Sequence, residues 1–363
     1  MGESASIREK VKELELELSN TKYNKRTQHA IGLLKAKIAN LKDKAEQHER
    51  KSGALYGYAV KRSGDATVVI LGYPSVGKST ILNKLTNAKS LVASYEFTTL
   101  KVVPGLLEHR HAKIQLLDMP GVLKGAASGI GKGREVLAII RNADLLLIVI
   151  DATQPWQLAV LQNELYAAGV RFNEHEPDVK ITKTIKGGIF IGKTVRLTKL
   201  NDATIKAILN ELRITNAEVL IRDDVSADQL IDVVKGNRKY LPCIALANKV
   251  DLLTDEKKRQ LRVDIAISAV NDIGLEELKE LVFTRLDLIR VFCKQVGKKA
   301  DVEVPLILKR GAKVEDICRK LHKDFVRRFR YARVWGKSAK FGGQQQGMTH
   351  VVQDGDIVQL HLL

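Results

Sequence analysis

The sequence predicts an α/β fold with a parallel sheet in its largest domain, and three observations support this. From residue 66 onward, short apolar runs typical of buried strands alternate with segments of helical periodicity. The first run, residues 67–71 (TVVIL), leads through a glycine-containing loop into the helical pattern of residues 79–85 (STILNKL). Residues 144–151 (DLLLIVID) are almost continuously apolar, as in strands covered on both faces.

The composition indicates a folded protein with several domains. The chain has 363 residues, 45% hydrophobic and 28% charged, so we expect about two to four domains. It lacks the roughly 18 consecutive apolar residues of a membrane span, and its polar N-terminus predicts no signal peptide. Its three cysteines, Cys243, Cys293 and Cys318, form no Cys-x-x-Cys motif. These features predict a reduced, cytoplasmic protein.

The positive charge indicates a polyanionic partner. Lys and Arg number 60 against 42 Asp and Glu, a net charge of +18, which favours association with nucleic acid. Residues 289–363 hold 16 basic and 7 acidic residues, a net +9, or half of the excess. Binding to a membrane surface is the competing interpretation, but no basic amphipathic helix with exposed Trp or Phe stands out.

The N-terminal region predicts a helical hairpin. Residues 8–20 and 27–51 carry apolar side chains at helical spacing, including Leu34, Ile38 and Leu41. The favoured interpretation is a helical appendage packed on the next domain. The alternative is an arm that docks a protein partner or RNA.

The loop at residues 72–79 (GYPSVGKS) matches the phosphate-binding pattern of two glycines bracketing four residues, followed by Lys and Ser. Gly72 and Gly77 let backbone N–H groups turn toward anionic oxygens at a helix N-terminus. Lys78 adds a positive charge, and Ser79 offers a hydroxyl to Mg²⁺. The pattern predicts a nucleoside triphosphate with Mg²⁺. The expected contacts are Gly72, Pro74, Ser75, Val76, Gly77, Lys78, Ser79 and Thr80.

Two further segments suit a triphosphate site. Residues 94–100 (SYEFTTL) read as a polar loop with paired threonines, and the strand at residues 113–117 ends in Asp118-Met119-Pro120-Gly121. Asp118, at the carboxyl edge of a strand, is placed to hold a Mg²⁺-bound water. Gly121 lets a backbone N–H approach the terminal phosphate.

The last strand of the predicted sheet points to the base. Residues 243–247 lead into Asn248-Lys249-Val250-Asp251, and residues 265–267 lead into Ser268-Ala269. A carboxylate at Asp251 accepts two hydrogen bonds from guanine, whereas adenine offers no such pair of donors. Because an unpaired buried carboxylate is costly, GTP is predicted and a P-loop ATPase is disfavoured.

A glycine-rich segment follows the Asp118 motif at residues 129–134 (GIGKGR). It follows no strand and lacks the spacing of a dinucleotide fingerprint. We expect a flexible switch segment, ordered by the terminal phosphate, with an ordinary surface loop as the alternative.

Residues 172–240 exceed an ordinary α/β connection and predict an inserted domain. We expect a β-hairpin from residues 179–185 and 189–197, helices at 203–212 and 227–235, and a strand at 217–222. A basic cluster in this segment suits either RNA contact or a solvated sheet edge. Its members are Lys180, Lys183, Lys186, Lys193 and Arg196.

Residues 289–363 predict a small C-terminal domain. The domain is expected to open with residues 289–296 and to include residues 302–308, one helix at 314–325, and strands near 332–335 and 357–362. Basic residues are mixed with aromatic ones, which suits structured RNA, although the aromatic side chains of such a domain also form its core. These residues are Lys309, Arg310, Lys320, Lys323, Arg327, Arg328, Arg330 and Arg333, with Phe325, Phe329, Tyr331 and Trp335.

Together these motifs identify a family resemblance. Five motifs in the expected order resemble those of the translation-factor-related GTPases, and the whole chain resembles the developmentally regulated GTP-binding proteins of the Obg branch. The resemblance implies a helical region at 1–65, a P-loop GTPase domain at 66–171 and 241–288, and an insertion at 172–240. It also implies that the insertion is similar to the second domain of ribosomal protein S5, and that residues 289–363 form a β-grasp TGS domain.

The resemblance also implies roles for particular residues. Lys78, Thr99 and Gly121 are the implied catalytic residues, and Ser79, Thr99 and Asp118 the implied Mg²⁺ site. Lys249 would lie against guanine and ribose, and the Ala269 N–H would read guanine O6. The cofactors implied are GTP or GDP with Mg²⁺. In potassium-dependent relatives an Asn often stands where this chain has Ser75, so K⁺ is an optional cofactor without support from its usual ligand.

The chain departs from many GTPases directly after Gly121. Val122 and Leu123 stand where a water-orienting Gln is common, so slow intrinsic hydrolysis is expected. We therefore expect a cytoplasmic GTPase coupled to the ribosome or another structured RNA through its C-terminal domain, with a protein regulator possible. The alternative is a nucleotide-gated module that binds a protein partner with little turnover. The scattered histidines, including His109 and His111, suggest no zinc site.

Overall fold

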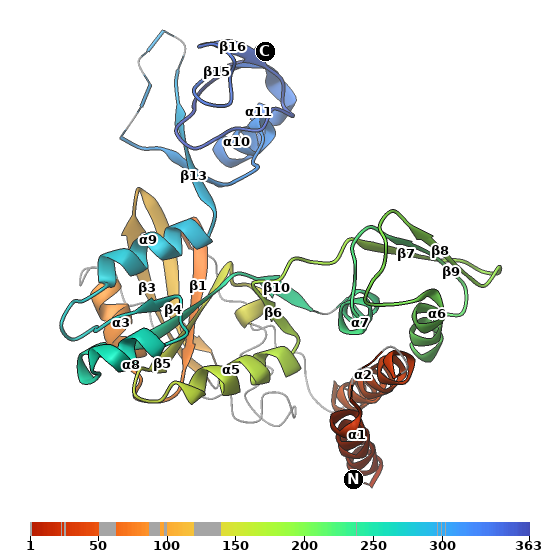
Figure 1. The fold of residues 1–363 in the computed structure, drawn as a ribbon. Helices are drawn as coiled ribbons and strands as arrows, with labels where there is room; N and C mark the ends of the chain where they lie inside the picture. Colours follow the sequence, from red (N-terminus) through yellow and green to blue (C-terminus); the bar gives the residue numbers. More distant parts are fainter. Residues whose placement is uncertain are drawn as a thin grey trace. The chain divides into compact units, whose positions relative to one another are not determined.

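The protein is represented by a computed structural model, which describes residues 2–22, 24, 27–50, 63–86, 95–97, 100–119, 139–236, 238–295, 297–298, 300–301 and 303–363. The chain divides into two compact units (Figure 1). The first comprises Met1–Gly57 and Gly169–Tyr240, and the second comprises Tyr58–Ala168 and Leu241–Leu363. The inserted segment and the N-terminal helices thus belong to one unit.

The second unit is built on a seven-stranded sheet. In spatial order its strands are β12 Ile265–Ala266, β11 Cys243–Asn248, β5 Leu145–Asp151, β1 Ala66–Gly72, β4 Ala112–Asp118, β3 Leu100–His109 and β2 Tyr95–Phe97. The five strands from β12 to β4 run parallel, and every residue of β1 and β5 is buried. The predicted parallel α/β sheet is confirmed, with both faces of its central strands covered.

Four α-helices and a 3₁₀ helix surround the described part of this sheet. They are α3 Lys78–Leu85, α5 Trp156–Ala167, α8 Asp255–Gln260, α9 Leu275–Arg285 and the 3₁₀ helix η1 Val250–Leu252. Ile81 of α3 and Leu278 of α9 share one core cluster with Val68 of β1 and Leu147 of β5. Because β1, β4, β5 and β11 are parallel, their carboxyl ends meet at one edge of the sheet, where α/β proteins bind ligands.

The prediction of a polar loop at residues 94–100 was wrong, because Tyr95–Phe97 form β2 and β3 begins at Leu100. The sequence of β3 explains why this strand was not predicted. It contains Pro104 and Gly105, which usually argue against a strand. Strand β2 pairs only with Leu100–Val102, so Pro104 lies beyond that pairing and pairs with β4 alone. A Cβ at Gly105 would lie 2.5 Å from Thr86 Cγ2 and 2.8 Å from Leu82 Cδ1. The glycine is therefore required where the α3 segment approaches the strand.

The C-terminal domain contains a five-stranded mixed sheet. Its spatial order is β14 Leu306–Lys309, β13 Leu288–Cys293, β17 Ile357–Leu362, β15 Phe329–Trp335 and β16 Gln344–Gln346. The prediction of one helix over residues 314–325 was wrong. The backbone of His322 is extended and separates α10 Val314–Leu321 from α11 Lys323–Arg328, whose N-terminus the His322 side chain caps.

The first unit combines the N-terminal helices with the inserted segment. Its helices are α1 Gly2–Asn20, α2 Gln28–Arg50, α6 Asp202–Glu211 and α7 Ala227–Lys235. Its strands are β6 Val170–Phe172, β7 Val179–Lys183, β8 Ile189–Lys193, β9 Ala217–Ile221 and β10 Lys239–Leu241. Strands β6 and β10 pair with each other, and the other three form a sheet in the order β7-β9-β8.

The predicted β7–β8 hairpin is therefore wrong. Strand β9 lies between the two, antiparallel to β7 and parallel to β8. The chain reaches β9 only after α6, and this arrangement buries Ile205 and Ile208 of α6 with Val219 of β9. The turn signal at Gly187 and Gly188 correctly separated two strands, but a turn signal does not determine which strands pair.

Within the first unit, helix α2 packs on the inserted segment. Fully buried Ala36 belongs to the same core cluster as α6 and β9. At the rim, Lys35 forms a 2.5 Å ion pair with Asp228 of α7, and Lys235 forms another with Asp43. Helix α2 is thus a packed helix, as in the favoured interpretation, and the domain on which it packs is the insertion. No helix in the described ranges is long and apolar enough to cross a membrane.

Candidate nucleotide site

The phosphate-binding loop leaves the carboxyl end of β1 with backbone geometry that only certain residues allow. A Cβ at Gly72 would lie 2.3 Å from Val149 O of the neighbouring strand. Gly77 has φ +95°, and a Cβ there would lie 2.4 Å from Asn248 Nδ2. Ser75 also has a positive φ, 62°. Close approaches thus require both glycines of the pattern, and the positive φ of Gly77 adds a second requirement at that position.

A Gly77→Ala substitution should therefore destabilise the loop and weaken GTP binding. The positive φ alone costs about 1–2 kcal/mol for an L-residue, and the clash with Asn248 adds to it. Gly187→Ala is the matched control, because Gly187 has φ +107° with nothing within 4 Å of its virtual Cβ. Thermal unfolding of both variants would separate the cost of the Asn248 clash from the cost of the positive φ, and GTP titration would measure the loss of nucleotide affinity. Equal effects of the two substitutions on GTP affinity would contradict this prediction.

Lys78 begins helix α3 and is held over the loop. Its side chain is buried, and Nζ donates hydrogen bonds to Gly72 O at 3.2 Å and Tyr73 O at 2.9 Å. Burial lowers the pKa of Lys78, while the nearby Asp118 carboxylate opposes that shift. A fixed cation next to inward-turning N–H groups is suited to phosphate oxygens.

Ser79 and Asp118 come together beside Lys78. Ser79 Oγ donates a 2.7 Å hydrogen bond to Asp118 Oδ2. Asp118 Oδ1 is buried and has no hydrogen-bond partner in the described part of the chain. Burial raises the pKa of Asp118, and the Ser79 hydrogen bond and Lys78 charge partly offset this.

The Ser79–Asp118 pair fits Mg²⁺. A hydroxyl oxygen and an orphaned carboxylate oxygen are the hard oxygen donors that this ion prefers, either directly or through bound water. A cation would also remove the cost of leaving Asp118 Oδ1 unpaired. Thr99 and Gly121 lie outside the described residues, as do Val122, Leu123 and the glycine-rich segment 129–134.

Asn248 connects the phosphate loop to the predicted base-recognition loops. It ends β11 and is 3% exposed. Its Nδ2 donates to Val76 O at 2.9 Å, and its Oδ1 accepts the Ala269 N–H at 3.0 Å. The N–H expected to read guanine O6 is thus already donated to Asn248, so a nucleotide would have to share or redirect it.

Lys249 is positioned by Asp151, a residue that the sequence analysis missed. Lys249 has φ +67°, and its Nζ donates a 2.7 Å hydrogen bond to Asp151 Oδ2. Although burial opposes it, hydrogen bonds from Lys249 and Thr153 hold the pKa of Asp151 below its usual value. The available signal was that Asp151 ends β5 as Asp118 ends β4.

Asp251 presents an exposed carboxylate in η1, two residues after Lys249. Ser268 and Ala269 are buried beyond β12, and the Ser268 N–H and C=O pair with Ile273. Pro74 and Ser75 are exposed at the tip of the phosphate loop, whereas Val76 is buried beneath it. Apart from Thr99 and Gly121, which lie outside the described ranges, the predicted site residues lie at or just beyond the carboxyl ends of β1, β4, β11 and β12.

Three protein families match successive parts of the chain. One described as a 50S ribosome-binding GTPase matches residues 67–182, and one described as the C-terminal region of the same domain matches residues 186–288. A TGS domain matches residues 289–362. These matches confirm the predicted GTPase domain and C-terminal TGS domain.

Curated relatives match along nearly the whole chain. A GTP-binding protein of Methanocaldococcus jannaschii is 50% identical over 368 residues, covering 99% of this chain and 94% of the relative. Human developmentally-regulated GTP-binding protein 2 is 41% identical and its Dictyostelium discoideum homologue 42%; both alignments cover 98% of this chain and 99% of the relative. Identity this high over full-length alignments means that the chain belongs to the family of developmentally regulated GTP-binding proteins.

Proposed function

We propose that this protein hydrolyses GTP to GDP and phosphate, slowly on its own, and is activated by ribosomes or another structured RNA. The observation that carries the hydrolysis proposal is the Ser79–Asp118 pair, whose buried Asp118 Oδ1 lacks a partner beside the Lys78 ammonium. In this proposal Lys78 holds the β- and γ-phosphate oxygens, and Ser79, Asp118 and Thr99 hold Mg²⁺. The Gly121 N–H contacts the terminal phosphate.

The reaction is phosphoryl transfer to water, in which positioning and charge neutralisation do most of the catalysis. Bound Mg²⁺ supplies positive charge to the phosphate oxygens. Lys78 keeps a second positive charge in place through its hydrogen bonds to Gly72 O and Tyr73 O. Because Val122 and Leu123 offer no polar side chain for the attacking water, efficient turnover requires groups from backbone, a monovalent cation such as K⁺, or a partner.

The RNA proposal is supported by the face of the C-terminal sheet that points away from its core. Along β15, Ala332 and Val334 point into the core, so Tyr331, Arg333 and Trp335 point to the other side. The rings of Tyr331 and His361 are stacked at 4.3 Å. Cations and aromatic rings on one sheet face suit phosphates and unpaired bases. By contrast, Phe325 and Phe329 pack against the core.

Further support comes from Lys294 and from the family match. Lys294 Nζ lies 4.7 Å from the ring centroid of Trp335, which adds a second cation to this face. The matching GTPase family is described as binding the 50S ribosome. An association with ribosomes would place this protein in the cytoplasm, where its free cysteines Cys243, Cys293 and Cys318 would stay reduced.

The test is GTP turnover at fixed Mg²⁺, in potassium or sodium chloride, with and without purified ribosomes. We expect ribosomes to accelerate turnover. Arg333→Gln should raise the ribosome concentration needed for half-maximal acceleration about tenfold, because the variant cannot form one charged hydrogen bond to phosphate. Arg319→Gln is the matched control, because Arg319 lies on α10 and pairs with Glu315. Acceleration that is equal for wild type and Arg333→Gln would contradict this use of the sheet face.

A second candidate function is a nucleotide-gated module that binds a protein partner, with turnover incidental. The observation that favours it is the pair Val122 and Leu123 after Gly121, which leaves no side chain to orient water. This function predicts turnover that neither ribosomes nor K⁺ accelerates. It also predicts a protein partner whose affinity differs between the GTP-bound and GDP-bound forms.

A further inference from the structure

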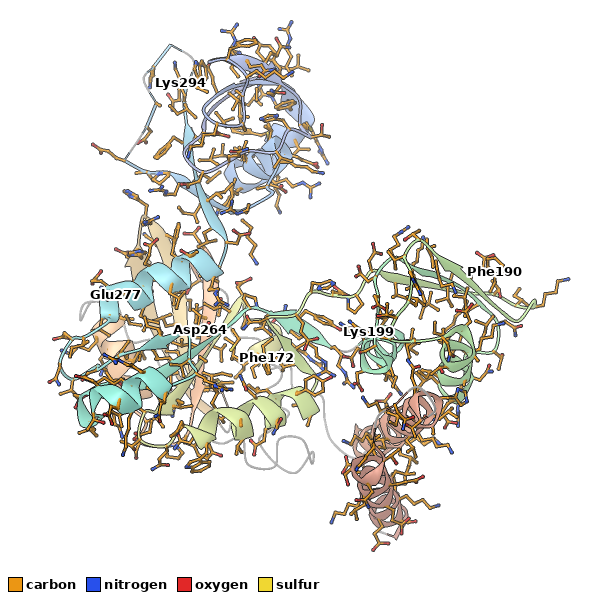
Figure 2. The ribbon with its side chains drawn as sticks, in the orientation of Figure 1. Phe172, Phe190, Lys199, Asp264, Glu277 and Lys294 are labelled. Carbon is orange, nitrogen blue, oxygen red and sulfur yellow. The ribbon has the colours of Figure 1, made fainter. Side chains whose placement is uncertain are left out.

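The sheet of the inserted segment has one covered face and one open face. Val179 and Ile181 of β7 and Ile189 and Ile191 of β8 pack against the core formed with α6 and α7. Because side chains alternate along a strand, the residues between them face the other way. Phe190 is on this open face and is 71% exposed (Figure 2).

The open face is a small surface with few obstructions around the Phe190 ring. Glu218 lies opposite Phe190 in the register with β9, and Thr182 lies opposite Glu218 on β7. The next row consists of Gly192, Leu220 and Lys180. Gly192 has no side chain, so on β8 nothing projects from the open face beside the Phe190 ring. One acidic residue, Glu218, and one basic residue, Lys180, share the face with the ring.

The segment that contributes β7 and β8 is strongly basic, although Lys180 is its one basic strand residue on the open face and Lys183 and Lys193 alternate toward the covered side. Residues 179–199 contain no Asp or Glu and six basic residues, all exposed, namely Lys180, Lys183, Lys186, Lys193, Arg196 and Lys199. Among the described residues, Lys193 is the one of these six with an ion pair, at 2.7 Å to Asp202. The same span exposes Ile185 at 98% and Val195 at 37%. Unpaired cations next to exposed apolar side chains indicate an interaction surface.

We propose that this face is a second RNA-binding surface, in which Phe190 stacks on an unpaired base and the surrounding cations neutralise phosphates. RNA suits these residues because a single exposed ring offers a stacking platform, while the charge excess is too extended for one small anion. The inference rests on the proposed function in its choice of ligand, but it concerns a different compact unit from the C-terminal sheet.

The test is binding of a fluorescently labelled single-stranded uridine oligonucleotide to the full-length protein, followed by anisotropy. Phe190→Ala should weaken binding about fivefold or more, as expected when a stacked base loses its ring. Phe190→Trp should retain affinity, whereas Phe190→Leu should behave like Phe190→Ala. Leu16→Ala is the matched control, since Leu16 is 63% exposed on α1 of the same unit.

Charge variants test the phosphate contacts separately. Lys180→Gln should make binding less sensitive to salt, by about 0.7 in the slope of log affinity against log salt for each phosphate that is no longer neutralised. Glu218→Gln should strengthen binding, because it removes the negative charge opposite Phe190.

Wild-type affinity of Phe190→Ala, with weakened binding of Arg333→Gln, would overturn this inference and leave the proposed function standing. Full affinity of Phe190→Leu would also overturn it, because a leucine cannot stack on a base as an aromatic ring does. Absence of wild-type binding to both oligonucleotide and ribosomes would overturn both proposals.

Discussion

Lys78→Ala should abolish high-affinity GTP binding while leaving the protein folded. The buried ammonium has no substitute among the described residues of the loop, where its two hydrogen bonds hold it over the Gly72 and Tyr73 carbonyls. Loss of a buried, hydrogen-bonded charge costs about 3 kcal/mol, or on the order of a hundredfold in affinity. Titration with a fluorescent GTP analogue would measure the loss.

Lys84→Ala is the matched control for this prediction. Lys84 lies on the same helix, α3, but its 2.7 Å ion pair with Asp272 is on the surface, where such pairs contribute little. Its removal should leave GTP affinity unchanged. Circular dichroism would establish that Lys78→Ala is folded. Normal GTP affinity in a folded Lys78→Ala protein would mean that the triphosphate binds elsewhere.

The sheet and much of the site could be predicted because they depend on local sequence. The apolar runs of β1, β5 and β11 located strands, and parallel strands bring their carboxyl ends to one edge. Gly72, Asp118 and Asn248 each end such a strand, so their proximity follows from the topology. Hydrogen-bond partners did not follow in the same way. That Asn248 receives the Ala269 N–H depends on how two loops, distant in sequence, are placed.

Strand pairing and helix breaks were harder to predict because they depend on the tertiary core. The strands at 179–183 and 189–193 were recognised, but β9 is inserted between them and buries Val219 against α6. Likewise, no Pro or Gly marks the break at His322, where Phe325 and Val326 of α11 turn to pack against the core. In both segments the burial of side chains decided between arrangements that local propensity allows equally.

Asp251→Asn should change the base selectivity of the protein from guanine to xanthine. In the proposed site the Asp251 carboxylate accepts two hydrogen bonds from guanine N1–H and the exocyclic amine. An Asn presents one acceptor and one donor, which leaves the guanine amine mismatched but complements the 2-oxo group of xanthine. Sites built around such hydrogen bonds discriminate by about a thousandfold or more. Competition of unlabelled GTP, XTP and ATP against a labelled nucleotide would measure the change.

The placement of Asp251 makes this prediction specific. Asp251 is exposed in η1, so its substitution should change nucleotide choice without the loss of folding expected for buried Asn248. Asp255→Asn is the matched control, since Asp255 is 86% exposed on α8 and pairs with Lys258 at 3.0 Å. Unchanged guanine selectivity in Asp251→Asn would remove this residue from base recognition. A stable variant with lower GTP affinity and higher XTP affinity would show that Asp251 recognises the base. A loosened phosphate loop, as expected from loss of the Asn248 contacts, would instead lower the affinity for both nucleotides.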